Sequence, residues 1–535
     1  MVKMLDCTLR DGAYIVDAEF GSAAITGIIS KLEEAGIEII ECGWLKDKEH
    51  IEGTSFFHVP EDLLGYLKNK NRETIYTAMI DWDRYDVDQL PVNDGRSLDA
   101  IRVVFPYNRF REGIAVGSEI LKKGYKVFFQ AANTLAYSPE DLLALANELN
   151  SMDGTPEGLS IVDTFGAMYE EDLTRISEIL DKHLDRHIRL GFHSHNNQQL
   201  SYALTMAFIK KFKDSDRDVI IDASLCGMGR GAGNTTTELA AGYLSKLKLK
   251  NYDMDAILDA IDIYMTPFLE KYKWGYSTPY FLAGVYCCHV NNIAYLTKNH
   301  RCNSKDMRNV IESMKPEDRC KYDYDLLEEK YIENQDRKIN DDLVMGKLKS
   351  AFADKKVVLI APGRSSVTDI NKIKNFIQNN SCIVIAVNAL LADYEYDYLF
   401  LTNKVRYDYA ETAMSDQFVR TPRILLSNIK TSGNNNEYIV NFNRAIKRGW
   451  EHFDNAVICC LRLLNRMRIE DVYIAGFDGF KHKYNESYAD ASLPTLNPDN
   501  RWDELNEEIK DMFRDVKQNS GDMNIHFLTE TIYDE

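Results

Sequence analysis

The stretch LDCTLRDGAYIVD, residues 5–17, ends an apolar run with an arginine and an aspartate side by side, Arg10 and Asp11. A short β-rich run, Lys3–Cys7, leads into this pair. In parallel α/β proteins, the loops that follow the strands carry the chemistry. The stretch therefore indicates that the tip of the first strand contributes to a functional site.

Similar β-rich runs recur over the first 250 residues and alternate with amphipathic stretches such as 23–35, 140–150 and 171–183. The later runs are Ile37–Cys42, Thr74–Ile80, Asp99–Phe105, Tyr125–Gln130, Leu159–Asp163, Ile188–His193 and Val219–Leu225. Eight strands that alternate with helices predict a (β/α)8 TIM barrel, with a doubly wound open sheet as the competing topology.

The remaining sequence predicts further parts, because 535 residues are too many for one ordinary core. We expect the barrel over residues 1–250 and a helical extension and linker over 251–345. A smaller Rossmann-like α/β domain is expected over 355–535, and it starts with KKVVLIAPGRSS at 355–366.

Composition excludes several classes of protein. A formal charge of −19 argues against nucleic acid as the main partner. No apolar run reaches the roughly 18 residues of a membrane helix, and the N-terminus predicts no secretory signal. Ten cysteines without a CxxC pair suggest reduced thiols, so we expect a cytoplasmic protein.

Three motifs suggest a site at the strand ends. In GFHSHNN (191–197), His193 and His195 are two residues apart and face the same way on a strand. Two imidazoles and the Asp11 carboxylate suit a divalent metal, although an HxH pair also occurs by chance. Glu41 would orient Arg10 or a metal-bound water, or be a surface carboxylate. The glycine-dense CGMGRGAGN (226–234) would hold an anion or form tight turns.

Together, TLRDG, HSHNN and GMGRGAGNTTTE resemble motifs of the DRE-TIM metallolyase superfamily over roughly residues 1–300. VDTFGAM (162–168) and AGVY (283–286) are similar to segments of its 4-hydroxy-2-oxovalerate aldolase branch. The resemblance implies a divalent metal, with Mn²⁺ or Mg²⁺ expected and Co²⁺ or Zn²⁺ also compatible. It implies these residue roles: metal ligands Asp11, His193, His195 and Asn234; enolate stabilisation by Arg10; substrate contacts Thr164 and Tyr286.

The implied reaction makes or breaks a C–C bond beside a 2-oxo acid such as pyruvate, through an enolate that Arg10 stabilises. Tyr14 departs from the aldolase branch, which has a histidine base at this place. Either Tyr14 has a perturbed pKa, Tyr286 or His289 takes the proton, or the substrate differs. A Tyr14 that only lines the pocket is an equally open interpretation.

The second domain carries weaker signals. VVLIAPGRSS is a buried strand followed by a Gly-Ser loop, and the domain loosely resembles those of bacterial sialyltransferases and hydroxymethylpterin pyrophosphokinase-like proteins. This likeness implies a nucleotide or nucleotide-sugar pocket at Gly363, Ser365, Asn388, Asn455 and Asp478. A module without catalytic activity is the alternative.

We therefore predict a metal-dependent aldolase or lyase that acts on a 2-oxo acid and an aldehyde. It would work as a homo-oligomer, in surface-polysaccharide or unusual sugar biosynthesis. Two alternatives are an acyl-CoA-dependent Claisen condensing enzyme and a glycosyl or nucleotidyl transferase that acts through the C-terminal domain.

Overall fold

The computed structural model divides the chain into two compact units. The first comprises residues 1–293 and 319–321, and the second comprises 294–318 and 322–535. The structure describes residues 1–68, 70–298, 302–335, 339–431, 436–450, 453, 455–481, 487–494 and 501–534. Over these residues, no helix is both long enough and apolar enough to cross a membrane.

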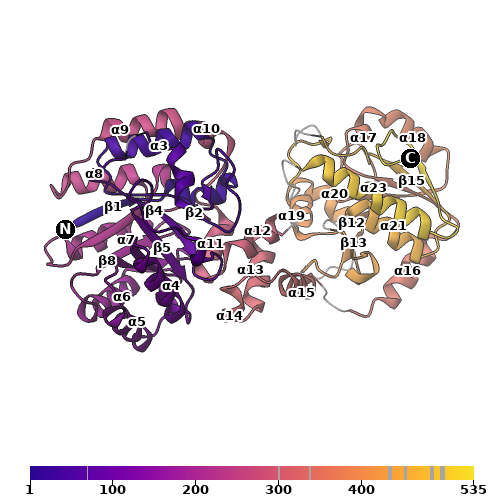
Figure 1. Cartoon of the computed structure of the whole chain (residues 1–535). Helices are drawn as coiled ribbons and strands as arrows, with labels where there is room; N and C mark the ends of the chain where they lie inside the picture. Colours follow the sequence, from indigo (N-terminus) through magenta and orange to yellow (C-terminus); the bar gives the residue numbers. More distant parts are fainter. Residues whose placement is uncertain are drawn as a thin grey trace. The chain divides into compact units, whose positions relative to one another are not determined.

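A closed sheet of eight parallel strands forms the centre of the first unit (Figure 1). The strands are β1 (Val2–Asp6), β2 (Ile39–Leu45), β4 (Ile75–Asp81), β5 (Ala100–Phe105), β6 (Lys126–Ala131), β7 (Gly158–Asp163), β8 (Arg189–Ser194) and β9 (Val219–Ala223). β1 pairs with β2 on one side and with β9 on the other, which closes the barrel. The predicted TIM barrel is confirmed, because an open doubly wound sheet would leave these edges apart.

Six longer helices follow barrel strands in the described part of this unit. They are α3 (Ser22–Glu34), α4 (Phe110–Lys122), α5 (Pro139–Ser151), α6 (Glu170–His183), α7 (Ser201–Phe212) and α8 (Thr237–Lys246). In place of a longer helix, the described part of the connection after β2 holds the short strand β3 (Phe56–Phe57) and the 3₁₀ turn η1 (Pro60–Gly65), and the connection after β4 holds the 3₁₀ turn η2 (Val87–Gln89). The second connection, WDRYDVDQLPVNDGRSL (82–98), lacks helical periodicity and contains a proline and a glycine, so no helix forms there.

The segment after the barrel is helical. Its elements are α9 (Met254–Ala260), the π-helical turn η5 (Ile261–Met265), α10 (Thr266–Lys271), α11 (Thr278–Val285), α12 (Val290–Lys298), α13 (Ser304–Ser313), α14 (Pro316–Arg319), α15 (Tyr324–Gln335) and α16 (Asp342–Phe352). The division between the two units falls within α12, at Ile293. The predicted domain boundaries and the independence of the domains stay predictions.

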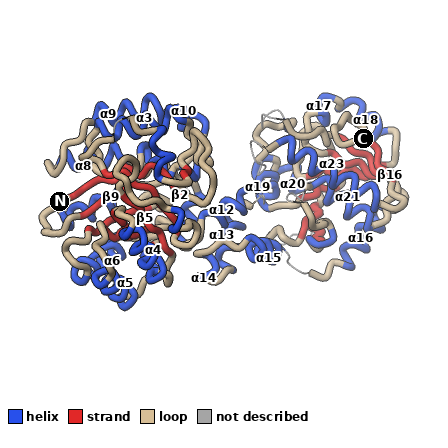
Figure 2. The backbone as a smooth tube through the Cα atoms, viewed as in Figure 1, coloured by secondary structure: helices blue, strands red, loops and turns tan. Residues whose placement is uncertain are grey.

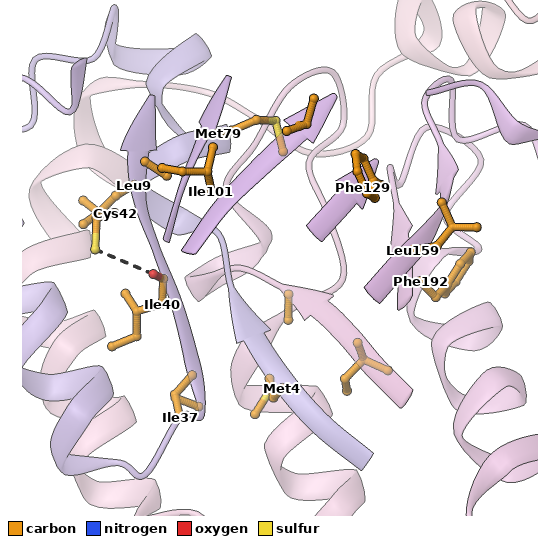
Figure 3. Packing of buried hydrophobic residues seen from close by; sticks show 14 of the residues in the cluster. Met4, Leu9, Ile37, Ile40, Cys42, Met79, Ile101, Phe129, Leu159 and Phe192 are labelled. Atoms are coloured by element: carbon orange, nitrogen blue, oxygen red, sulfur yellow. Dashed lines mark hydrogen bonds between the residues drawn. The ribbon is translucent and has the colours of Figure 1, made fainter. Parts of the chain in front are cut away.

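The main apolar core lies between the barrel strands and the helices around them (Figure 3). Met4, Ile40 and Ile101 contribute to it from three strands, and each is at most 1% exposed. Phe129 and Phe192 add aromatic rings that are fully buried. Their burial removes a large apolar area from water, which is the main favourable contribution to folding.

A second set of side chains fills the inside of the barrel. Its apolar layer consists of Leu5, Cys7, Ile39, Ala100, Phe128 and Ile220. Two residues further along four of these strands stand Glu41, Arg102, Gln130 and Asp222, all at most 2% exposed. Since strand side chains alternate in direction, residues two apart point the same way, so a polar layer covers the apolar one toward the C-terminal ends of the strands.

The second unit contains an open sheet of seven parallel strands in the order β14-β13-β12-β11-β10-β15-β16. Figure 2 draws these strands in red among the blue helices of this unit. The strands are β10 (Lys356–Ile360), β11 (Cys382–Val387), β12 (Tyr398–Leu401), β13 (Arg423–Leu426), β14 (Glu437–Val440), β15 (Asp471–Ala475) and β16 (Asn524–Phe527). The chain runs outward from β10 to β14 and returns through α21 (Ala456–Arg466) to β15, on the other side of β10. This reversal confirms a Rossmann-like order and creates a crevice where β10 and β15 end.

Helices connect these strands. Those described are α17 (Ser365–Thr368), α18 (Ile370–Gln378), α19 (Lys404–Ala413), α20 (Ser415–Arg420), α21 and α23 (Trp502–Asn519).

Candidate metal centre

Asp11, His193 and His195 lie together at the C-terminal end of the barrel strands. Asp11 ends α1 (Thr8–Asp11), the short turn after β1, and His193 lies in β8 with His195 just beyond it. Because β9 pairs with both β1 and β8, the ends of these two strands are close. One ligand atom from each of the three side chains lies within 4.8 Å of the others. Strand ends therefore bring together residues that are far apart in the sequence.

The three side chains are buried, with 1%, 4% and 7% of their surfaces exposed. His195 Nδ1 lies 3.9 Å from Asp11 Oδ2, and the two imidazole rings are 5.2 Å apart and nearly perpendicular. Polar groups buried so deeply are stable only when partners satisfy their charges and lone pairs.

Two buried acceptors at this point have no hydrogen-bond partner. They are His195 Nδ1 and Asn234 Oδ1. Asn234 reaches the cluster because its backbone pairs with His195, and its Nδ2 donates to Asp11 Oδ2 at 2.5 Å. A divalent cation binds nitrogen and oxygen atoms with free lone pairs beside a carboxylate. These two acceptors and Asp11 provide such ligand atoms, so the residues fit the predicted metal.

Asp222 fixes the orientation of His193. His193 Nδ1 lies 3.0 Å from Asp222 Oδ2, so this nitrogen carries a hydrogen and donates a hydrogen bond to the carboxylate. The other ring nitrogen, Nε2, is then left as the acceptor. A histidine that donates one nitrogen to a carboxylate and offers the other to a metal is the common arrangement at metal sites.

A chain of alternating charges links this histidine to the Arg10–Asp11 pair. Arg10 donates to Asp11 Oδ1 at 2.5 Å and to Glu41 Oε2 at 2.7 Å. Arg102 Nη1 lies 2.9 Å from the same Glu41 oxygen, and Arg102 Nη2 donates to Asp222. Each charge therefore has an opposite charge beside it, which makes burial inside the barrel tolerable.

These contacts set the protonation states. Burial alone would raise the pKa of Asp11, but Arg10, the two histidines and the Asn234 hydrogen bond outweigh it and lower this pKa. Arg102 and His193 likewise lower the pKa of Asp222 against the effect of burial. Burial lowers the pKa of His195 to about 4, despite the nearby Asp11 carboxylate. At neutral pH the cluster thus offers an anionic carboxylate and a neutral imidazole, as metal binding requires.

Tyr14 stands at the edge of the cluster, in α2 (Ala13–Val16). Its ring meets Trp44 edge-on at 6.1 Å, and the Arg230 guanidinium lies over it at 4.8 Å. Solvent reaches 46% of the residue, and desolvation by the protein around the phenol raises its pKa against the opposing effect of Arg230 and Arg10. A raised pKa keeps Tyr14 protonated at neutral pH, which suits a proton donor better than a base.

Thr164 and Tyr286, the two predicted substrate-contact residues, lie outside the cluster of Asp11, His193 and His195. Thr164 follows β7, and its Oγ1 accepts a hydrogen bond from the Asn133 backbone at 2.7 Å. The carbonyl of the preceding Asp163 accepts one from the His195 backbone, so Thr164 is close to the cluster along the chain. Tyr286 is the first residue after α11, and the Arg319 guanidinium lies 5.7 Å from its ring. Their predicted substrate contacts stay predictions.

Three residues of this region were missed from the sequence. Arg102 and Asp222 are charged residues in the otherwise apolar strands AIRVVF and VIIDA, and such an exception inside a strand is the signal that could have found them. Arg230 lies within the glycine-rich stretch, where no local pattern distinguishes it.

In the second unit, one pocket lies at the crevice between β10 and β15. Four of the five residues predicted there line it: Gly363, Asn388, Asn455 and Asp478. The fifth, Ser365, supports the pocket, because its backbone N–H donates to Asp478 at 2.8 Å. Arg406, which is 7% exposed, brings a positive charge to the lining.

Comparisons with known proteins place the barrel in context. Residues 109–264 match the family model described as HMGL-like, so the barrel carries an HMGL-like domain and the predicted resemblance is confirmed. The 4-hydroxy-2-oxovalerate aldolase of Thermomicrobium roseum is 27% identical over 279 residues, which cover 50% of this chain and 73% of the relative. The oxaloacetate decarboxylase of Mycobacterium tuberculosis is 29% identical over 260 residues, 48% of this chain and 74% of the relative.

A crystal structure of an N-terminal domain from Bacteroides vulgatus, described as that of a proposed aldolase, is 26% identical in sequence. The structural match covers 55% of this chain and 95% of the Bacteroides chain, with a TM-score of 0.47.

Proposed function

We infer that this chain, with its HMGL-like domain over residues 109–264, is a divalent-metal-dependent carbon–carbon lyase that acts on a 2-oxo acid. The observation that carries this proposal is the buried cluster of Asp11, His193 and His195 with Arg10 beside it. Relatives named as an aldolase and as an oxaloacetate decarboxylase support the same substrate class. When bound, a divalent cation would polarise the keto group of the 2-oxo acid.

Arg10 is suited to stabilise the enolate. Glu41 and Asp11 hold its Nε and Nη1, which leaves Nη2 to donate to the substrate oxygen. A base removes a methyl proton from the 2-oxo acid, and the remaining electron pair forms the enolate. The enolate carbon then bonds to the carbonyl carbon of an aldehyde, whose oxygen takes up a proton; cleavage is the reverse. A fixed charged donor at the enolate oxygen typically contributes ~10²–10³ in rate.

The finer predictions are part of this proposal. We propose Mn²⁺ or Mg²⁺ as the ion, an aldehyde as acceptor, a homo-oligomer, and a role in surface-polysaccharide or unusual sugar biosynthesis. Decarboxylation of oxaloacetate is the second candidate reaction, because the name of the Mycobacterium relative supports it and loss of CO₂ yields the same enolate.

The test is exchange of pyruvate methyl protons with deuterated water, which needs only metal and enolate chemistry. We expect exchange in the metal-loaded protein, and loss of metal and exchange in His193→Ala. His187→Ala, which removes an exposed histidine, is the matched control and should behave as wild type. Wild-type exchange in a metal-free His193→Ala protein would contradict the proposal.

We also propose that the pocket of the second unit binds a nucleotide or nucleotide sugar. Its position at the reversal of strand order, the Asn455 cap of α21 and the Arg406 charge support this. Titration calorimetry of the full chain with CMP, UDP and ATP tests it. We expect micromolar to millimolar binding that Asn388→Ala weakens; no heat with any nucleotide would contradict it.

A further inference from the structure

Arg230 is held rigidly beside the metal centre, four residues before Asn234. Its loop turns sharply at Gly231 and Gly233, which have φ values of +66° and +85°. The loop is fastened to the neighbouring one, because the Ala232 N–H donates to Asn197 Oδ1 at 2.8 Å. Four residues of chain span at most about 14 Å, so the Arg230 backbone lies within that distance of Asn234.

The guanidinium of Arg230 has only neutral partners. Its Nη2 lies 3.1 Å from His289 Nε2 and 2.8 Å from Asn291 Oδ1, and its plane lies over the Tyr14 ring. No acidic side chain forms an ion pair with it anywhere in the described ranges. A guanidinium has five N–H donors. His289 and Asn291 engage only those of Nη2, so the Nε and Nη1 hydrogens are not used by these partners.

The neighbours of Arg230 do not cancel its charge. Burial, together with Arg230 itself, lowers the pKa of His289 to about 3, so this ring is neutral at physiological pH. Tyr14 is neutral as well, because its pKa is raised. The Asp81 carboxylate is near enough to interact weakly with Arg230, but Lys46 and Arg84 lie around it too. A net positive charge is therefore left at the edge of the site.

We propose that Arg230 binds an anionic group, a carboxylate or a phosphate, on the acceptor aldehyde. This inference rests on the proposed function. Arg10 is already engaged at the metal cluster and serves the 2-oxo acid, so a second arginine nearby is free to serve the second substrate. The Nε–H and Nη1–H groups of this planar guanidinium, which His289 and Asn291 leave unused, can donate charge-assisted hydrogen bonds to either oxyanion. The Tyr14 ring holds the guanidinium in the plane that this contact needs.

The experiment compares aldehydes in matched pairs with pyruvate as the donor. The pairs are 4-oxobutanoate against butanal, and glyceraldehyde 3-phosphate against glyceraldehyde, so they separate carboxylate from phosphate. We expect kcat/KM to be about 10- to 100-fold higher for the charged member of one pair, which is the usual value of charge-assisted hydrogen bonds. This preference should fall to near one in Arg230→Gln and Arg230→Met, and Arg230→Lys should retain part of it.

Arg111→Gln is the control, because it removes the same charge from the exposed surface of α4 and should keep the wild-type preference. A wild type that exchanges pyruvate protons but favours neither charged aldehyde overturns this inference alone. A wild type without exchange overturns the proposed function instead. The role of Arg230 is also overturned if the preference for the charged aldehyde survives in an Arg230 variant that folds. It is overturned as well if the variant loses this preference only because its KM for pyruvate is raised in the exchange assay.

Discussion

Asp222→Asn tests whether the buried charges inside the barrel hold the metal centre in place. The substitution keeps the shape of the side chain and an oxygen near His193 Nδ1, and it removes one negative charge. Arg102, which is 1% exposed, then keeps only Glu41 as an acidic partner, and Glu41 is shared with Arg10. Only the charge balance changes, so the result reports on electrostatics rather than packing.

The expected cost follows from this burial. Removing one partner of a fully buried ion pair typically destabilises a protein by about 3–5 kcal/mol, because the other charge is left uncompensated. Metal affinity should fall about 10- to 100-fold, the usual effect of losing the partner that orients a ligand histidine. Asp216→Asn removes an exposed carboxylate and should change stability by less than about 0.5 kcal/mol.

Calorimetric unfolding of the full chain in chelator measures stability without a contribution from metal, and dye competition measures metal affinity. Arg102→Met completes a double-mutant cycle. The double variant should be less destabilised than the sum of the single variants by about 0.5–3 kcal/mol, because it removes both charges together. Strict additivity, or an Asp222→Asn protein with wild-type metal affinity, would refute the reasoning.

Gly229→Ala should weaken metal binding at least about 10-fold in a metal titration. The added Cβ would come 2.3 Å from Asn234 Nδ2 and 2.6 Å from Asp11 Oδ2. Gly242→Ala is the control, because its added Cβ would meet nothing within 4 Å. Tyr14→Phe should lower turnover at every pH from about 6 to 9 without moving the limbs of the pH–rate profile, since the raised pKa keeps the phenol protonated throughout; profiles of equal height would show that Tyr14 takes no part. The fragment 1–345 should fold and bind metal alone, as chromatography and metal analysis would show, and an insoluble fragment would count against separable domains.

Residues whose role follows from local pattern could be predicted from the sequence. The eight strands appear as β-rich runs, and the strand-end rule brings Asp11 and His193 together without a three-dimensional model. An isolated charge inside an apolar strand marks Arg102 and Asp222, but their pairing with each other and with Glu41 could not be predicted, because the three strands are distant in the sequence. The orphaned acceptor of Asn234 is likewise visible only once the loop has been placed.

The connections after β2 and β4 mark another limit. The alternation of strands and helices led us to expect a helix after each strand, but the polar connection after β4 holds a 3₁₀ turn instead. Barrel closure depends on the pairing of strands, so it tolerates such replacements on the outside. Tyr14 could be recognised as a departure from the motif, but its contact with Arg230 depends on a loop more than 200 residues away.

The pairing of β1 with β9 has a consequence for how the chain is made. Thr8 accepts a hydrogen bond from the Leu225 backbone, 217 residues later, and the strands beside them close the barrel. During synthesis, β1 therefore waits with one edge unpaired until almost the whole barrel has left the ribosome, and so long a loop closes slowly. Asp11 meets the two histidines only at that moment. A metal ion held by all three residues would thus be captured only by a chain that has completed its barrel, and its retention would report successful folding in the cell.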